Sequence, residues 1–377
     1  MMPATRSSLL LLILLAALCL VLIAYVPART QSEGATVTMP LGTPVHIKAP
    51  LGLPPVPIPA DNPPTEETVA LGRRLYYDPQ LSVDGTISCA SCHAPQFAFA
   101  DNEPTSQGVG KKHGTRHAPT VINSAYSPLQ FWDGRAGSLE EQAVGPMANP
   151  VEMAHTLDGV VKRLQADVKY PQLFKKAWGT DQITIDMVAK SIASFERTVV
   201  AGDSPFDRFY YGRDSRALSG DAQRGLRIFM SPKKGNCQVC HTIGKDYSLF
   251  TDGKFHNLGV GADTRGNLND VGRFAITKKD EDMGCFKTPS LRNLANRGPY
   301  MHDGSFPTVK DALAHYIGGG NWNAHLDKEI HSLDILTFDE RSDLLAFLDS
   351  LNGMLPDNIG PPADLAAPKM KSSSAGK

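Results

Sequence analysis

At 377 residues the chain is long for one domain and large enough for two domains that each bury a core. Its formal net charge of −1 gives no indication of a polyanionic partner, which argues against binding to nucleic acid. Six cysteines would favour disulfides in an exported chain, but four of them belong to two motifs of another kind, described below.

The N-terminus has the order of an export signal. Arg6 precedes an uncharged apolar run over residues 9–26, which predicts a signal peptide within residues 1–28. The run is close to the shortest length that spans a bilayer, and Val26-Pro27-Ala28 is a poor cleavage site. An uncleaved anchor in the inner membrane is therefore the alternative. In both cases we expect the rest of the chain in the periplasm.

Proline is frequent in the next segment, residues 29–64, where it disfavours helix and favours extended backbone. We expect this segment to be a linker between the membrane and the folded body. The last residues, 356–377, are rich in Pro, Ala, Ser and Lys, and we expect them to form a flexible tail.

The signals between these ends are helical. Thr65 can cap a helix whose first turn holds two glutamates, and Thr184 can cap another. Thr337 and Glu340 have the spacing of a capping box before an apolar run. No stretch alternates polar and apolar residues with period two, so we predict a mainly α protein with long loops.

Two motifs of the form C-x-x-C-H occur, at residues 89–93 and 237–241. This spacing attaches a c-type haem, because two thiols form thioethers and the adjacent histidine becomes an iron ligand. Zinc binding or a redox disulfide would account less well for two copies in an exported chain. The expected residues are Cys89, Cys92 and His93 for one haem, and Cys237, Cys240 and His241 for the other. Cys285 is left as a buried thiol.

Each haem motif follows a similar segment, residues 72–79 in the first case and 225–232 in the second. Two copies of helix, loop and motif indicate a duplication. We therefore predict two tandem cytochrome c-like domains, over residues 65–215 and 216–355, with the boundary near residues 212–219.

Several further stretches resemble the bacterial dihaem cytochrome c peroxidase/MauG family. They are residues 116–123, 131–136, 139–143, 286–293 and 299–305. The resemblance extends from about residue 66 to residue 353. It implies that the N-terminal haem reacts with hydrogen peroxide and that the C-terminal haem transfers electrons.

The resemblance also assigns residues around the haems. Trp132 corresponds to the family's tryptophan between the two haems, where an aromatic ring can relay an electron. Gln142, Pro146 and Glu152 correspond to its distal-pocket residues. Glu152 would transfer the peroxide proton, Gln142 would hold the peroxide, and Pro146 would limit access.

The family's reductively activated members place a histidine over the N-terminal haem in the resting state. In this chain that position is Val109, which cannot bind iron, although His113 could replace it if the loop were shifted. We therefore expect the N-terminal haem to have His93 on one side and an open site on the other.

At the C-terminal haem, the position of the family's axial methionine is taken by Tyr316, as in MauG, with Met301 and His315 as alternative ligands. A thioether favours ferrous iron, whereas a phenolate favours iron in its higher oxidation states. The substitution therefore indicates MauG-like chemistry that starts from the ferric enzyme.

Family members also hold calcium between the haem domains through an asparagine side chain and two backbone carbonyls. The carbonyl positions map to Arg297 and Pro299, but the asparagine position is His117. Calcium prefers oxygen ligands, so calcium binding is doubtful in this chain.

Three functions are consistent with these residues. The first is a peroxidase that takes electrons from a small periplasmic cytochrome c or cupredoxin. The second is a MauG-like oxidase that uses peroxide to modify residues of a partner protein. The third is an electron-transfer cytochrome without turnover, which the open site and Glu152 disfavour.

Overall fold

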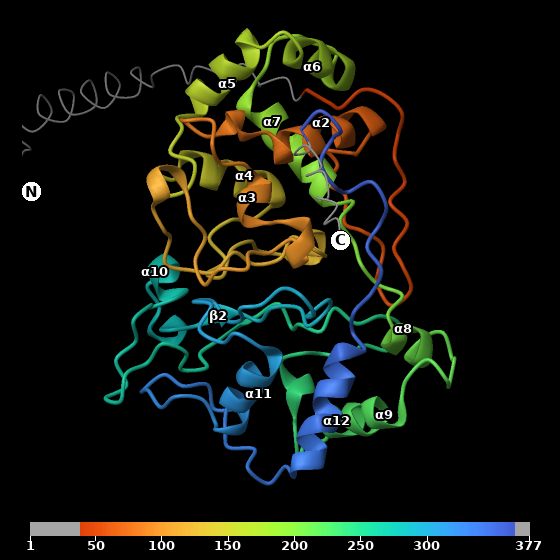
Figure 1. The fold of residues 1–377 in the computed structure, drawn as a ribbon, viewed down its shortest axis with the longest axis vertical. Coiled ribbons are helices and arrows are strands. Elements are labelled where there is room, and N and C mark those ends of the chain that lie inside the picture. The colour runs from red at the N-terminus through yellow and green to blue at the C-terminus, as the bar shows by residue number, and fades with distance from the viewer. Residues whose placement is uncertain (1–37, 366–377) are drawn as a thin grey trace, which may run out of the picture. The chain divides into compact units, whose positions relative to one another are not determined.

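The computed structural model describes residues 38–365, so the expected signal segment 1–28 lies outside the described residues. Helices joined by long loops make up the body, which confirms a mainly α fold (Figure 1). The only β-strands in residues 38–365 are β1 (Phe255–His256) and β2 (Phe286–Lys287), which pair antiparallel. Within the same range, no helix combines the length and apolar character needed to cross a membrane.

The α-helices are α2 (Glu66–Tyr77), α3 (Cys89–Cys92), α4 (Leu139–Ala148), α5 (Leu157–Ala166), α6 (Tyr170–Trp178), α7 (Ile185–Glu196), α8 (Pro205–Tyr210), α9 (Gly220–Met230), α10 (Phe274–Thr277), α11 (Val309–Ile317) and α12 (Phe338–Asp349).

Three helices begin where the sequence predicts. Thr65 caps α2, Thr184 caps α7 and Thr337 caps α12, each by accepting a hydrogen bond from a backbone N–H of the first turn. Thr337 forms the predicted capping box with Glu340. These caps satisfy donors that have no partner inside the helix, and they depend only on neighbouring residues.

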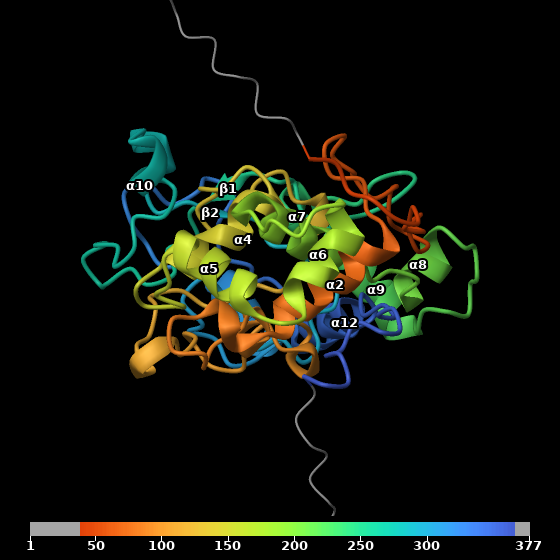
Figure 2. The ribbon, with the colours of Figure 1, turned by 90° about the horizontal axis from the view of Figure 1, so that it is seen from above.

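The hydrophobic residues form two main clusters, one in each half of the chain. The first involves helices α2, α4, α5, α6 and α7, and the second involves α8, α9 and α12. The two groups occupy the upper and lower parts of the body in Figure 1, and Figure 2 shows α5 and α6 from above. The second cluster already includes Phe206 of α8, which precedes the expected boundary at residues 212–219. The division into two domains there stays a prediction.

The repeated segment has the same structural role in both halves. Gly72 lies where α2 meets α7, and a Cβ atom there would be 1.7 Å from the Ser191 carbonyl oxygen. Gly225 lies where α9 meets α12, and a Cβ atom there would be 2.0 Å from the Asp343 carbonyl oxygen. Only glycine permits such close approach of two helix backbones. The paired glycines therefore explain why the two segments resemble each other.

The proline-rich segment corrects one prediction, because its described part is not a free linker. Leu53 and Val56 are buried against Val200 of the body. Asn62 is fully buried and its side chain donates to the Lys190 carbonyl oxygen at 3.0 Å. Prolines fix an extended backbone, but the apolar residues between them remain free to pack. Residues 39–64 are therefore part of the folded body.

The C-terminal tail needs a similar correction. Leu355, Ile359 and Leu365 pack against the first hydrophobic cluster, although they follow α12 in the chain. The Tyr77 hydroxyl donates to the Ile359 carbonyl oxygen at 2.7 Å, and Arg74 forms an ion pair with Asp364. The tail is thus docked on α2 up to residue 365, and the expected flexible residues 366–377 lie outside the described range.

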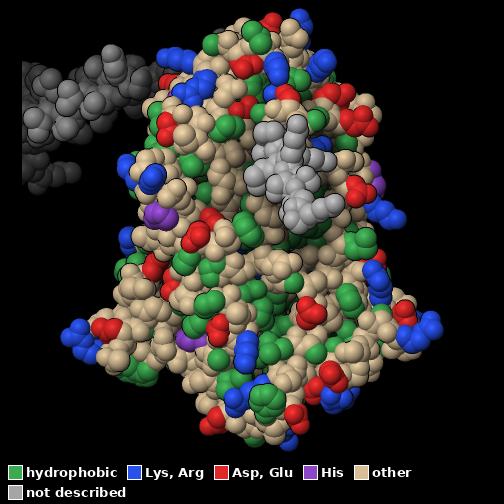
Figure 3. Space-filling model, viewed as in Figure 1, with side chains coloured by type: hydrophobic (Ala, Val, Ile, Leu, Met, Phe, Trp, Pro, Cys, Tyr) green, Lys and Arg blue, Asp and Glu red, His purple; other side chains and the backbone are tan. Residues whose placement is uncertain are grey.

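Charged side chains of both signs are interspersed on the face of the body shown in Figure 3. This distribution agrees with the small net charge of the chain.

Candidate functional site

The two C-x-x-C-H motifs present their histidines in the same way. Nδ1 of His93 lies 2.9 Å from the Pro119 carbonyl oxygen, and Nδ1 of His241 lies 2.9 Å from the Phe250 carbonyl oxygen. Donation of the Nδ1 proton to a carbonyl leaves Nε2 as the lone-pair nitrogen, which is the form that binds iron. Burial lowers the pKa of His241 to about 4, so its imidazole is neutral at physiological pH.

The C-terminal motif borders a cavity of about 320 Å³, a volume in the range of ligand-binding sites. Its lining includes Cys237, Cys240 and His241, so the three residues of the motif face one space. Trp132 and Tyr316 face the same cavity from other segments of the chain.

The charges around this cavity fit an acidic prosthetic group. Arg297 and Lys287 line it, and neither forms an ion pair with any residue in the described part of the chain. Glu329 is the only carboxylate among its lining residues. Buried charges are normally paired, and a c-type haem supplies two propionates.

Three buried polar atoms of the lining also have no hydrogen-bond partner among the described residues. They are Nε2 of His302, Oγ of Ser124 and Oγ1 of Thr288. Such atoms cost free energy unless a bound group satisfies them. The thiols, the histidine, the cations and these unpaired atoms together fit a haem, which Cys237, Cys240 and His241 would hold.

Tyr316 faces the cavity because of its place on α11. Val309, Ala312 and Leu313 line the same cavity, and their spacing puts them on one face of the helix with Tyr316. His315 lies one position away, and its Nε2 is 2.9 Å from the Leu258 carbonyl oxygen. His315 is therefore engaged elsewhere, which leaves Tyr316 and, from a separate loop, Met301 in the lining.

The N-terminal motif borders a second cavity, of about 40 Å³. The structure brings together here every residue that the sequence assigned to the peroxide pocket. The lining comprises Ile87, Ser88, Cys89, Cys92, His93, Gln142, Ala143, Pro146, Glu152, Met153, Ile192 and Glu196.

Helix α4 positions the first two pocket residues. Gln142 and Pro146 are four residues apart and so lie on one face of the helix. Pro146 has no N–H, which leaves the Gln142 carbonyl without its usual helical partner. Glu152 follows the helix in a loop that is held by a hydrogen bond from Met153 N to the Pro146 carbonyl oxygen, 3.2 Å long.

Glu152 has the electrostatics of a proton-transferring group. Burial raises the pKa of its carboxyl, and the nearby Arg135 and a hydrogen bond from Asn149 oppose this shift. The Asn149 amide donates to Glu152 Oε1 at 2.6 Å and so fixes its orientation. A carboxyl whose pKa is moved toward neutrality can both accept and return a proton.

The loop with Val109 lies beside this pocket. Val109 is buried, and its N–H donates to the Glu152 carbonyl oxygen at 2.8 Å. His113 is exposed, and its Nδ1 is 3.0 Å from the Thr105 carbonyl oxygen. The described contacts thus give His113 no place in the pocket lining. An open distal side stays a prediction.

Trp132 lies in a segment between α4 and the C-terminal cavity. Its indole N–H donates to the His117 carbonyl oxygen at 2.8 Å, and its ring faces the C-terminal cavity. The preceding residue, Phe131, lies against Gly145 of α4, between Gln142 and Pro146 in sequence. The segment therefore spans from the helix of one cavity to the lining of the other.

The chain matches characterised proteins along most of its length. It is 41% identical over 297 residues to the methylamine utilization protein MauG of Methylorubrum extorquens, a match that covers 78% of this chain and 81% of that protein. The chain belongs to the dihaem cytochrome c peroxidase/MauG family. It therefore carries two c-type haems and is a peroxide-dependent oxidoreductase.

Both branches of the family are similar to this chain. The model for di-haem cytochrome c peroxidase matches residues 66–215. The cytochrome c551 peroxidase of Nitrosomonas europaea is 37% identical over 316 residues, covering 83% of this chain and 89% of that protein. Among solved structures, a MauG-like protein associated with microbial copper homeostasis has 32% sequence identity and a TM-score of 0.74, over 86% of this chain and 98% of that one.

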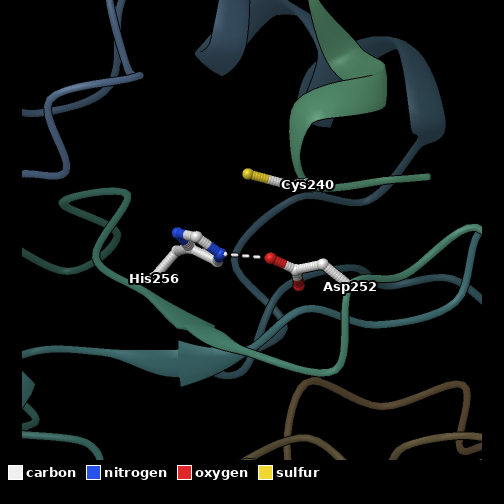
Figure 4. Close-up of side chains that lie close together, drawn as sticks. All are labelled: Cys240, Asp252 and His256. Carbon is white, nitrogen blue, oxygen red and sulfur yellow. Dashed lines mark hydrogen bonds and ion pairs between the residues drawn. The ribbon is translucent and has the colours of Figure 1, made fainter.

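A third cluster, shown in Figure 4, needs the family assignment for its interpretation. Cys240, Asp252 and His256 place possible metal-binding atoms within 4.8 Å of one another. In a chain with two c-type haems, the C-x-x-C-H motif predicts that the Cys240 sulfur forms a haem thioether, which would not be available to a separate metal. His256 instead lies between two carboxylates, with Nε2 2.9 Å from Asp252 and Nδ1 2.5 Å from Asp327. The pair of aspartates orients His256 beside the haem attachment.

Sequence reasoning missed two buried residues at the haem sites. Glu196 of α7 lines the N-terminal cavity, and burial raises the pKa of its carboxyl to about 8. Arg297 lines the C-terminal cavity, whereas the family resemblance gives a role only to its backbone carbonyl. Burial of a charged residue depends on contacts from distant segments, so neighbouring residues gave no signal. Cys285 is buried and free, as predicted.

Proposed function

We propose that this chain is a periplasmic dihaem peroxidase in which hydrogen peroxide reacts at the N-terminal haem. The observation that supports this most strongly is the convergence of Gln142, Pro146 and Glu152 on the cavity that Cys89, Cys92 and His93 also line. An electron carrier has no need of a carboxyl of raised pKa beside its iron ligand. The export signal predicted within residues 1–28 supports the periplasmic location.

In this proposal each pocket residue has a defined task. When bound, the haem supplies an iron that binds peroxide and exchanges electrons. Glu152 would accept the proton of the peroxide oxygen that faces the iron and return it to the other peroxide oxygen, which leaves as water. The Gln142 amide donates a hydrogen bond that orients the peroxide, and Pro146 restricts the space around it. Two protons and two electrons complete the reduction of peroxide to two water molecules.

The C-terminal haem, held by Cys237, Cys240 and His241, would supply the entry point for electrons, and Trp132 would relay them toward the N-terminal site. The contact of Phe131 with Gly145 of α4 supports this route, because Phe131 precedes Trp132 in the chain and α4 carries Gln142 and Pro146 of the N-terminal cavity. The source would be a small periplasmic cytochrome c or cupredoxin.

A second candidate is a MauG-like oxidase whose electrons come from residues of a partner protein, which are modified as a result. Two observations favour it. Tyr316 faces the C-terminal cavity, where a phenolate would favour higher oxidation states of iron, and proteins named MauG are among the most similar relatives.

The decisive experiment mixes peroxide with the untreated ferric holoenzyme and follows its absorption spectrum. We expect an immediate change without prior reduction, and a ferric electron paramagnetic resonance spectrum with one high-spin and one low-spin haem. Two low-spin signals and no reaction would contradict the open N-terminal site. Adding reduced cytochrome c then separates the two candidates, because rapid oxidation of the cytochrome supports the peroxidase and its absence supports the MauG-like oxidase.

A further inference from the structure

Arg297 is a buried cation at the junction of the two halves of the chain. The residue is 8% exposed, and within residues 38–365 its guanidinium donates a single hydrogen bond, of 2.6 Å from Nη2 to the Ser290 carbonyl oxygen. It forms no ion pair with a residue in the range 38–365. Burial lowers its pKa to about 10, so the guanidinium remains charged at neutral pH.

His117, from the first half of the chain, is a second buried residue of the same cavity. It is 4% exposed and lines the same cavity as Arg297. Its N–H donates to the His302 carbonyl oxygen at 2.8 Å, and its own carbonyl accepts from Trp132. Nδ1 of its ring lies 3.1 Å from the Glu103 carbonyl oxygen. His117 and Arg297 thus face one cavity from different segments of the chain. Burial, and to a lesser extent the Arg297 charge, lower the pKa of His117.

This donor set does not fit calcium. Calcium binds six to eight oxygen atoms, with carboxylates prominent among them. Here the side chain at the expected ligand position is an imidazole, and a fixed guanidinium lies nearby. Glu329 is the only acidic residue in the cavity lining, so no cluster of carboxylates offsets a second cation.

We propose that the Arg297 guanidinium takes the place of the interdomain calcium ion as a positioning residue, and that this chain functions without calcium. The cation would offset negative charge that the haems bring to the cavity. Arg297 lines the same cavity as His241, the residue expected to bind the C-terminal iron. This inference rests on the haem sites and not on the reaction proposed above.

The first test measures the metal content of the holoenzyme and its response to a calcium chelator. After dialysis we expect no calcium by elemental analysis, and we expect excess EGTA to leave the haem spectra and midpoint potentials unchanged. About one tightly bound calcium per chain, or a spectral change on chelation, would overturn the proposal. Neither readout depends on peroxide turnover.

The second test removes the positive charge of Arg297. In Arg297→Gln the midpoint potential of the C-terminal haem should shift to more negative values, because a nearby positive charge favours ferrous iron. Arg297→Lys keeps the charge and should keep the potential, and Arg216→Gln, an exposed position, is the matched control. An unchanged potential in Arg297→Gln would refute the role of the guanidinium.

A double variant tests the exclusion of calcium directly. His117→Asn combined with Arg297→Gln restores an oxygen ligand and removes the competing charge. We expect it to bind about one calcium per chain in a titration with calcium chloride. Failure to bind calcium in the folded, haem-loaded variant would overturn the claim that these two residues exclude it.

Discussion

The two haem motifs hold their histidines in the same way, but different residues line the cavities beside them. Both histidines hold Nδ1 against a backbone carbonyl at 2.9 Å. The N-terminal cavity is lined by Gln142 and two carboxyls of raised pKa, Glu152 and Glu196, whereas the C-terminal cavity is lined by cations and Tyr316. The two motifs therefore present their histidines in the same way, whereas the residues that line the two cavities differ in charge.

The largest expected effect would come from removing the carboxylate of the N-terminal site. Glu152→Gln should keep both haems attached but slow the reaction with peroxide by roughly 10²–10⁴-fold, the usual contribution of a general acid–base group. Stopped-flow absorption spectroscopy measures the rate. Glu281→Gln, at an exposed loop position, serves as control. A rate equal to that of the unchanged enzyme would remove Glu152 from the mechanism.

The second effect concerns stability and compares one buried ion pair from each half. Arg292 and Asp207 are 1% and 0% exposed and are joined by two hydrogen bonds of 2.8 Å. Arg292→Met leaves a buried carboxylate unpaired and should lower the free energy of unfolding by about 3–5 kcal/mol. Both carboxylates keep other hydrogen bonds, but Arg197→Met should cost less, because its partner Glu140 is 17% exposed and can be partly solvated. Denaturant unfolding of the holoprotein measures both values, and equal losses would contradict this ranking.

The third prediction concerns Tyr316, the expected axial ligand by which the C-terminal site differs from the N-terminal one. Tyr316→Met should raise the midpoint potential of that haem by at least about 60 mV, which is a tenfold preference for ferrous iron. Potentiometric titration resolves the two haems. Tyr316→Phe removes the hydroxyl and should abolish the ligand without replacing it. If neither variant moves the potential, the axial ligand is another residue, with Met301 as the first alternative.

The smallest effect is a change in pH dependence at the N-terminal site. The carboxylate form of Glu152 accepts the proton, so the rate should fall as the pH decreases through the pKa of Glu152. Because burial raises this pKa, the fall should occur at a higher pH than for a solvated glutamate. Arg135 opposes the shift, so Arg135→Gln should move the fall to still higher pH, by less than about one unit for a partly exposed charge. A movement to lower pH would contradict the assignment to Glu152.

Sequence predicted best what neighbouring residues determine. The caps at Thr65, Thr184 and Thr337 and the two haem motifs depend on spacings of a few residues, and the structure places them as expected. The family register grouped Gln142 and Glu152, and both line the cavity that His93 lines, which spacing alone could not predict. Their roles stay a prediction.

Predictions failed where the outcome depends on distant contacts. The composition of residues 39–64 indicated extended backbone correctly but could not show that Leu53 and Val56 are buried in the body. The tail near Ile359 failed for the same reason. The buried charge of Arg297 could be found only once both halves of the chain were placed together.

The two ends of the described chain have a consequence for how the molecule unfolds. The segment before α2 is held by Arg292 of the second half, which donates to the Gly52 carbonyl oxygen, while the segment after α12 packs on the first half. Each half of the chain thus contacts a terminal segment that adjoins the other half. Neither half can unfold alone without breaking these contacts. We expect one cooperative transition rather than two, so the separation of the haem irons is preserved until the whole body unfolds.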